Sequence, residues 1–294
     1  MNKDMDHKLI ATPSRTSAIM KQYDIKMKKS LGQNFLVEPQ ILQRLVEVAE
    51  IDSETTVIEI GPGIGALTEF LALSAKKVLA FEIDQRFVNI LQDTLSPYNN
   101  VEVIHQDILK VDFSQSDYAY LQQSRRLVVV ANLPYYITTP IIMHLLASQL
   151  PFDSLVMMMQ KEVAERMTAK VGTKAYNSLT VAIQLQMKAK LAFIVPPTVF
   201  IPRPNVDSAV LKLTRLENPS HSFKNSDSFQ QFVQACFKQR RKTLWNNLKA
   251  YYPDQETTYL ESCFTKADIV PSRRAETLNL DEFIKLFNTL NEKN

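Results

Sequence analysis

Three glycines within five residues constrain the fold of this chain more than any other feature of its sequence. The chain has five glycines among 294 residues, and Gly61, Gly63 and Gly65 are three of them. An apolar run at residues 56–60 precedes them, and an amphipathic run at residues 66–73 follows. Residues without a Cβ are needed where a strand turns tightly into a helix and the backbone approaches a ligand. The pattern therefore predicts the first strand, turn and helix of a doubly wound α/β cofactor-binding domain.

Short apolar runs alternate with helical patterns over most of the chain, which predicts a parallel sheet buried on both faces. The expected strands are residues 57–60, 78–82, 101–105, 127–131, 155–160, 192–195 and 208–213. The expected helices of this part are residues 14–25, 39–49, 66–74, 85–95, 139–149, 161–169 and 177–186. Four prolines stiffen the loop at residues 196–204, and no helix separates the two strands that it joins, so we expect an antiparallel terminal pair.

After Leu216 the composition changes, and a polar linker at residues 218–222 is followed by helical patterns alone. The expected helices are residues 226–238, 240–250, 256–264 and 281–290. The sequence therefore predicts a basic N-terminal extension at residues 1–27, an α/β domain at residues 28–216 and a small all-helical domain at residues 217–294.

The composition excludes several classes of protein. Hydrophobic residues make up 45% of the chain, which suffices for a core, but no apolar run approaches the ~18 residues of a membrane span. The N-terminus has no apolar signal segment. Cys236 and Cys263 fall on apolar helical positions, and neither they nor the four histidines form a metal-ligand spacing. We expect a cytoplasmic protein without a metal.

Positive charge is concentrated in two segments of a chain whose net charge is only +3. Residues 1–33 contain seven Lys and Arg against three acids, and residues 228–253 contain five Lys and Arg and no acid. Two basic segments on a nearly neutral protein indicate a surface for a polyanion. Taken alone, the same pattern also fits two solvated helices.

The glycine turn is compatible with two classes of cofactor. The spacing Gly61-x-Gly63-x-x-Ala66 fits the dinucleotide fingerprint. The spacing Glu59-x-Gly61-x-Gly63-x-Gly65 fits the S-adenosylmethionine turn of class I methyltransferases. The turn leaves both classes open.

Acidic residues end the next two predicted strands. Glu82 lies 21 residues after Gly61, where a carboxylate can accept hydrogen bonds from both ribose hydroxyls in either class. Asp107 follows the third strand, where it could meet an adenine amino group or could simply cap a helix. The carboxyl ends of parallel strands meet at one edge of the sheet, so these acids and the turn predict one nucleoside site.

The motif Asn132-Leu133-Pro134-Tyr135 follows the fourth predicted strand and indicates methylation of an adenine. The exocyclic amine of adenine is a poor nucleophile because its lone pair is delocalised into the ring. The Asn132 side-chain oxygen and the next backbone carbonyl can hold both amine hydrogens, while Pro134 stiffens that carbonyl. Tyr135 offers a flat face for an extruded base. Taken alone, the motif is also a common strand-to-helix turn.

Together these motifs resemble the KsgA/RsmA/Dim group of ribosomal RNA adenine dimethyltransferases, over nearly the whole chain. The matching segments are residues 28–36 (KKSLGQNFL), 57–68, 81–84 (FEID), 106–107 (QD), 132–135 (NLPY), 160–166 (QKEVAER), 199–208 (VFIPRPNVDS) and 237–244 (FKQRRKTL). The resemblance implies a class I S-adenosylmethionine-dependent (Rossmann-like) sheet with its strands in the order third, second, first, fourth, fifth, seventh, sixth, beside a small helical C-terminal domain.

The resemblance also assigns roles to individual residues. It implies that S-adenosylmethionine is bound by Asn34, Leu36, Gly61, Gly63, Glu82, Asp107 and Asn132. It implies that Tyr135 and Phe200 stack on the target base beside Asn132, Leu133 and Pro134; by its position alone, Phe200 could equally be a core aromatic residue. The residues expected to contact RNA are Lys28, Lys29, Arg203, Arg240, Arg241 and Lys242, the last three on a predicted helix.

By resemblance, the reaction transfers two methyl groups to each of two adjacent adenosines in a 3′-terminal hairpin of 16S ribosomal RNA, within the assembling small ribosomal subunit. The enzyme is expected to act as a monomer, without metal or membrane. One alternative is an Erm-type methylase of 23S ribosomal RNA, although those relatives usually carry Ile at the position of Leu133. Others are a non-catalytic ribosome-assembly factor and an NAD oxidoreductase, which leaves the Asn132 motif and the basic segments unexplained.

Overall fold

The computed structural model describes residues 9–25, 34–133, 137–148, 150–217 and 226–292. The chain divides into two compact units. The first contains residues 1–164 and 190–215, and the second contains residues 165–189 and 216–294. One division of the chain falls between residues 215 and 216, while residues 165–189 group with the C-terminal helices.

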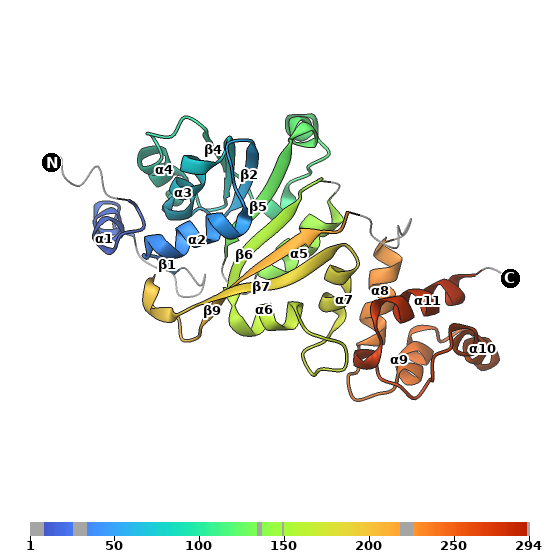
Figure 1. Cartoon of the computed structure of the whole chain (residues 1–294). Coiled ribbons are helices and arrows are strands. Elements are labelled where there is room, and N and C mark those ends of the chain that lie inside the picture. Colours follow the sequence, from blue (N-terminus) through green and yellow to red (C-terminus); the bar gives the residue numbers. More distant parts are fainter. Residues whose placement is uncertain (1–8, 26–33, 134–136, 149, 218–225, 293–294) are drawn as a thin grey trace. The chain divides into compact units, whose positions relative to one another are not determined.

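A seven-stranded sheet forms the centre of the first unit (Figure 1). Its strands are β2 (Thr55–Ile60), β3 (Lys77–Glu82), β4 (Val101–His105), β5 (Arg126–Asn132), β6 (Ser154–Gln160), β7 (Met187–Val195) and β9 (Ser208–Arg215). They follow the order β4-β3-β2-β5-β6-β9-β7, in which β4 to β6 pair in parallel and β9 runs antiparallel to β6. All seven predicted strands and their predicted order are confirmed.

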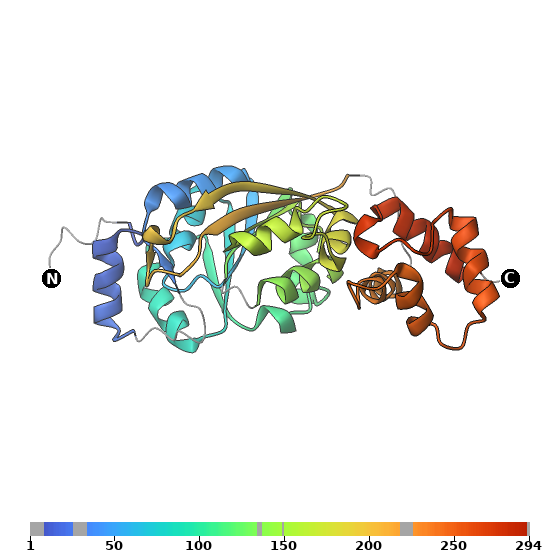
Figure 2. The same cartoon turned by 90° about the horizontal axis from the view of Figure 1, so that it is seen from below.

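Helices lie on both sides of this sheet (Figures 1 and 2). Those of the first unit are α1 (Pro13–Gln22), α2 (Pro39–Ala49), α3 (Ala66–Ser74), α4 (Gln85–Thr94), α5 (Thr138–Ala147) and the start of α6 (Lys161–Met167), while α7 (Ser178–Gln184) belongs to the second unit. On one face of the sheet, alternate strand residues such as Val57 and Val128 pack with apolar residues of α2, α3 and α4. The intervening residues, such as Ile58 and Val129, are equally buried. Burial on both faces explains why these strands are continuous apolar runs.

A second, two-stranded sheet was not predicted. The strand β1 (Phe35–Leu36) pairs antiparallel with β8 (Phe200–Ile201), so Leu36 lies opposite Phe200. The N–H of Val37 extends the pairing by donating to the carbonyl of Val199 at 2.9 Å. The expected stiff loop at residues 196–204 therefore contains a strand and a short 3₁₀ helix, η5 (Pro197–Val199).

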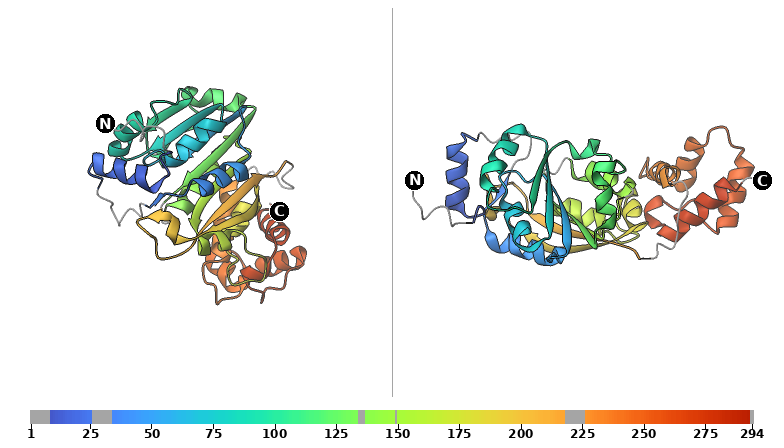
Figure 3. Two further views of the ribbon diagram at one scale, coloured as in Figure 1. Left: turned by 60° about the vertical axis from the view of Figure 1, so that its left-hand side comes forward. Right: turned by 90° about the horizontal axis from the view of Figure 1, so that it is seen from above.

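The helices α8 (Ser226–Cys236), α9 (Leu244–Tyr251), α10 (Thr257–Ala267) and α11 (Leu280–Asn291) gather around one another in the second unit (Figure 3). Their core is rich in aromatic residues, including Phe229, Phe232 and Phe283, and it also contains Tyr176 and Val181 from the segment before β7. Cys236 and Cys263 are buried free thiols, as predicted. No helix in the described part of the chain is long and apolar enough to cross a membrane.

The predicted helix from residue 240 is wrong at its start, because Arg240, Arg241 and Lys242 lie in the turn between α8 and α9. The buried Asn247 side chain accepts a hydrogen bond from the N–H of Gln239 at 3.1 Å and donates to the carbonyls of Cys236 and Gln239. These bonds satisfy backbone groups that a continuous helix would otherwise pair, and Thr243 then caps α9.

Candidate cofactor and active site

The three glycines of the turn between β2 and α3 have backbone angles that favour residues without a side chain. The φ angles are +72° at Gly61, +59° at Gly63 and +92° at Gly65, all in the left-handed region. A Cβ at Gly61 would lie 3.2 Å from the Leu133 side chain, and one at Gly63 would lie 3.3 Å from the Phe35 ring. The turn therefore lies directly against β1 and the residue that follows β5.

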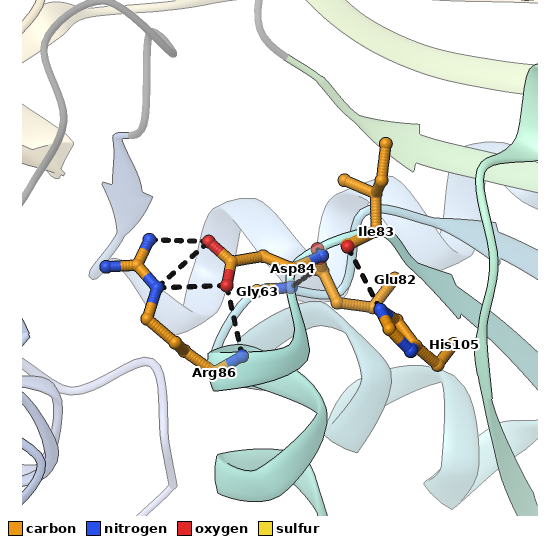
Figure 4. A network of polar contacts seen from close by, with 6 residues as sticks. All are labelled: Gly63, Glu82, Ile83, Asp84, Arg86 and His105. Atoms are coloured by element: carbon orange, nitrogen blue, oxygen red, sulfur yellow. Dashed lines mark hydrogen bonds and ion pairs between the residues drawn. The ribbon is translucent and has the colours of Figure 1, made fainter.

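Glu82 ends β3 beside this turn. Its carboxylate accepts hydrogen bonds from the N–H groups of Gly63, at 3.2 Å, and Asp84, at 2.9 Å (Figure 4). Burial raises the pKa of Glu82 above its ordinary value, although these backbone donors favour the charged form. Figure 4 also shows Asp84 directed to Arg86 and His105 directed to the carbonyl of Ile83. Glu82 is thus held in place by backbone groups on both sides.

Asp107 follows β4 and occupies the position predicted for it. Its Oδ1 accepts from the N–H of Leu109 at 3.0 Å and so caps the short 3₁₀ helix η3 (Ile108–Lys110). The preceding Gln106 donates its N–H to the carbonyl of Glu82 at 3.0 Å, which ties the ends of β3 and β4 together. Capping and ligand binding use different atoms of one carboxylate, so the cap does not exclude a second role.

A cavity of about 280 Å³ opens at the carboxyl ends of β2 to β5. The predicted site residues that line it are Asn34, Leu36, Gly61, Gly63, Glu82, Asp107, Asn132, Leu133 and Phe200. Lys28, Lys29, Pro134 and Tyr135 lie outside the described residues. Arg203 is exposed on the loop after β8. Residues from six separate segments therefore meet where a doubly wound sheet binds its ligands.

The strand register places three polar side chains of this cavity on one face of the sheet. Glu59 lies opposite Ala80 of β3 and Val130 of β5. Glu82 and Asn132 follow these partners by two residues, and side chains two apart in a strand share a face. The sequence analysis used Glu59 only as part of the turn motif. Its acidic character within an apolar strand was the signal that it belongs to the site.

Glu59 is a buried acid whose side chain lines the cavity, with only 1% of its surface exposed. Within the described part of the chain, its Oε2 has no hydrogen-bond partner. Burial, and to a lesser extent the neighbouring Glu82, raises the pKa of Glu59 to about 8. Glu59 is therefore mostly protonated at neutral pH.

The charged residues that line the cavity, as far as the structure describes it, are all acidic: Glu59, Glu82, Asp84 and Asp107. A dinucleotide would bring an anionic pyrophosphate into this acidic lining. S-adenosylmethionine brings a positively charged sulfonium group and ribose hydroxyls that need acceptors. The lining therefore fits S-adenosylmethionine, and it favours this cofactor over the dinucleotide that the turn alone also allows.

Phe200, in strand β8 opposite Leu36 of β1, lines the same cavity. Its side chain is 3% exposed and belongs to the apolar core that includes Phe35 and Leu36. Phe35 in turn meets Phe87 edge-to-face, with ring centroids 5.9 Å apart. Phe200 is thus a core aromatic residue that also forms a wall of the cavity, and its stacking on a base stays a prediction.

The basic turn of the second unit is exposed at Arg240, Arg241 and Lys242. The Arg240 guanidinium donates to the carbonyl of Lys174, which ties this turn to the segment before α7. The N–H of Gly172 donates to the carbonyl of Glu276 at 2.7 Å and ties the same segment to the loop before α11. The turn is therefore held by its neighbours while its cations face solvent. In the described ranges, no group of His, Cys, Asp and Glu could hold a metal ion.

Comparisons with known sequences extend over nearly the whole chain. The family model described as "Ribosomal RNA adenine dimethylase" matches residues 24–292. A protein named ribosomal RNA small subunit methyltransferase A from Enterococcus faecalis is 55% identical over 291 residues, which cover 98% of each chain. A protein of the same name from Bacillus pumilus is 54% identical over 292 residues, covering 99% of this chain and 98% of its own.

Two solved structures share the fold. A dimethyladenosine transferase from Plasmodium falciparum superposes with a TM-score of 0.74 at 31% identity, covering 87% of this chain and 97% of its own. The 23S rRNA methyltransferase ErmE superposes with a TM-score of 0.66 at 26% identity, covering 87% of this chain and 99% of its own. The architecture, with its class I methyltransferase sheet, is therefore the one that the sequence predicts.

Proposed function

The chain belongs to the ribosomal RNA adenine dimethylase family, and we propose that it dimethylates two adjacent adenosines in a 3′-terminal hairpin of 16S ribosomal RNA. The proposed substrate is the RNA of an assembling small subunit in the cytoplasm, and the enzyme acts as a monomer. The observation that carries the proposal is that Asn132, an acceptor for an adenine amine, ends β5 in the same acidic cavity as Gly61 and Glu82.

The residues around the cavity suit the binding of S-adenosylmethionine. Glu82 would accept hydrogen bonds from the ribose hydroxyls, and Asp107 would accept one from the adenine amino group. Gly61 and Gly63 line the cavity with backbone atoms alone, in left-handed conformations that favour glycine. Asn34 and Leu36 close the site from β1. When bound, S-adenosylmethionine supplies an electrophilic methyl group on a positively charged sulfur.

Asn132 would orient the amine that receives the methyl group. Its side-chain oxygen and the backbone carbonyl of Leu133 can accept both amine hydrogens, which lets the nitrogen lone pair localise. Asn132 does not ionise, so the chain contributes orientation and fixed dipoles here rather than a strong base. The proton of the methylated amine can leave to water. The sequence motif adds Tyr135, with Phe200, as the proposed stacking surfaces for the base.

The comparisons support small-subunit RNA as the substrate rather than large-subunit RNA. The relatives named for the small subunit are 54–55% identical over the whole chain, whereas ErmE, named for 23S RNA, is 26% identical. Specificity for one RNA depends on surfaces outside the cofactor site, so identity that extends through the C-terminal helices is relevant to the choice.

A labelled-methyl assay tests the proposed function directly. Immature small subunits from cells that lack the protein are incubated with purified protein and S-adenosylmethionine labelled in its methyl group. We expect up to four methyl groups per subunit, which primer extension would locate at two adjacent adenosines. Transfer to large-subunit RNA alone would support the Erm-type alternative. Tight binding of subunits without any transfer would support the assembly-factor alternative.

The exposed cations of the α8–α9 turn give a second prediction, for RNA binding. Replacing Arg240 and Arg241 together by Ala should weaken binding to the subunit RNA and reduce the salt dependence of the affinity. Each lost phosphate contact lowers the slope of log K against log salt by about 0.7–0.9. A salt titration of RNA affinity measures this slope, and the affinity for S-adenosylmethionine should not change.

The matched control removes two exposed cations of the same unit that are not part of the turn, Lys266 on α10 and Lys285 on α11. The net charge changes equally in both double variants. Equal slopes for the two variants would show that only the overall charge matters. An unchanged slope for the Arg240 and Arg241 variant would remove this turn from the RNA surface.

A further inference from the structure

Glu59 is a buried acid for which the proposed reaction has no role so far. It is the most buried of the acidic residues that line the cavity, and its Oε2 is unpartnered in the part of the chain that the structure describes. A buried carboxylate with one unpartnered oxygen is costly even though the Thr68 hydroxyl of α3 favours the charged form, whereas a carboxylic acid costs less. A positively charged ligand in the cavity would reverse this preference, because it stabilises the carboxylate at short range.

Among the residues that the structure describes, the charged groups of the elements around Glu59 do not already supply that positive charge. Glu82 on β3 and Asp107 before η3 are acids that line the same cavity. On α3, Glu69 is occupied by the N–H of Ile10 and the hydroxyl of Tyr98. The remaining charged groups on α2 and α4 are Arg44, Glu47, Arg86 and Asp93, of which Arg86 is paired with Asp84 and Asp93 accepts from Tyr23. None of these cations lines the cavity.

We propose that binding of S-adenosylmethionine releases a proton from Glu59, which leaves a carboxylate facing the positive charge of the bound cofactor. This inference rests on the proposed function, since it concerns the same cofactor. The step is balanced: the carboxyl O–H bond breaks, the proton passes to solvent, and the carboxylate negative charge is matched by the ligand cation. Glu59 is thereby a cofactor-binding residue that responds to charge.

The proposal has a consequence for the product. S-adenosylhomocysteine lacks the sulfonium charge and keeps only the ammonium, so a Glu59 carboxylate that faces the sulfonium would take up a proton again after transfer. Glu59 then favours the cofactor over S-adenosylhomocysteine, the product left after each transfer. A reaction that needs several transfers per RNA gains from a site that distinguishes the two.

Calorimetry measures the proton directly. The apparent binding enthalpy is compared at pH 6.5 in two buffers with different ionisation enthalpies, and the difference gives the number of protons released. Because the pKa of Glu59 is about 8, Glu59 is almost fully protonated in the free protein at this pH, and the ligand amine also remains charged. We expect close to one proton per S-adenosylmethionine, and we expect Glu59→Gln to remove most of that release.

Two further ligands identify which positive charge matters. S-adenosylhomocysteine keeps the ammonium but lacks the sulfonium, and 5′-methylthioadenosine lacks both. Release with S-adenosylmethionine alone is the expected result and assigns the effect to the sulfonium. Release with the first two assigns it to the ammonium and contradicts the preference for the cofactor over S-adenosylhomocysteine. Equal Glu59-dependent release with all three ligands would overturn the proposal. The matched control is Glu69→Gln, a buried acid on α3 that does not line the cavity, and it should release the parent number of protons.

Other outcomes separate this proposal from the proposed function. If the parent binds S-adenosylmethionine without releasing a proton, or if Glu59→Gln releases as many as the parent, the proposal is wrong and the function stands. If the parent does not bind S-adenosylmethionine, the function itself fails.

A second measurement uses the protein without ligand. A carboxyl group whose pKa is raised by folding stabilises the fold at low pH and loses this advantage as pH rises. The melting temperature of Glu59→Gln should therefore increase relative to the parent between pH 5 and pH 8.

Discussion

Asn132→Ala is expected to lower the rate of methyl transfer by on the order of 100-fold or more, the range seen when one preorganised polar group is lost. Asn132 ends β5, opposite Met158 of β6, and its side chain lines the cavity beside Leu133. Without the Asn132 side-chain oxygen, the adenine amine has one hydrogen-bond acceptor fewer, and the lone pair of its nitrogen stays delocalised. Single-turnover methylation of immature small subunits with labelled cofactor measures the rate.

The variant should still fold, since Asn132 is the last residue of its strand and is only partly buried. A binding assay with the same subunits should give nearly the parent affinity, because the side chain contributes orientation. The matched control is Asn89→Ala, an exposed asparagine on α4. If Asn132→Ala transfers methyl groups at the parent rate, the amine is held elsewhere and this mechanism is wrong.

Glu82→Ala is expected to weaken S-adenosylmethionine binding by roughly 1–3 kcal/mol, the scale for hydrogen bonds to charged groups. This free energy corresponds to about a 5- to 150-fold increase in the dissociation constant. The carboxylate is 5% exposed and is already aligned by the N–H groups of Gly63 and Asp84. Titration calorimetry with the cofactor measures the change.

Loss of Glu82 also leaves those two backbone donors without their acceptor, so the effect has a structural part. Glu82→Gln keeps one acceptor oxygen and should fall between Ala and the parent. The control is Glu102→Ala on the adjacent strand β4, an exposed acid that pairs with Lys77 and does not line the cavity. Unchanged affinity in a folded Glu82→Ala variant would contradict the assignment of this residue to the cofactor.

The central strands β2, β3, β5 and β6 were predictable because they are buried on both faces and therefore stand out as apolar runs. The same applies to the turn at Gly61, Gly63 and Gly65, whose left-handed angles leave few alternatives to glycine. The sequence also predicted that residues at the ends of parallel strands, such as Glu82 and Asn132, lie close together, because the topology fixes where those ends meet.

Other features depend on contacts between distant residues and leave no local signal. A two-residue strand has no periodicity, so the pairing of Leu36 with Phe200 could not be read from either segment. The turn at residues 239–242 has the composition of a helix, and it is the buried Asn247 side chain that decides otherwise. The raised pKa of Glu59 depends on burial and on Glu82, which only the folded chain provides.

The grouping of residues 165–189 with the C-terminal helices bears on how this fold can be recombined between relatives. Tyr176 packs against Phe237, with ring centroids 6.1 Å apart, and Val181 lies in the same core as Phe229. In a chimera that takes only the residues after 216 from a relative, Tyr176 and Val181 would pack against core residues of a different protein. The segment and the helices form one exchangeable module, so a chimera that preserves the packing carries both pieces from the same parent.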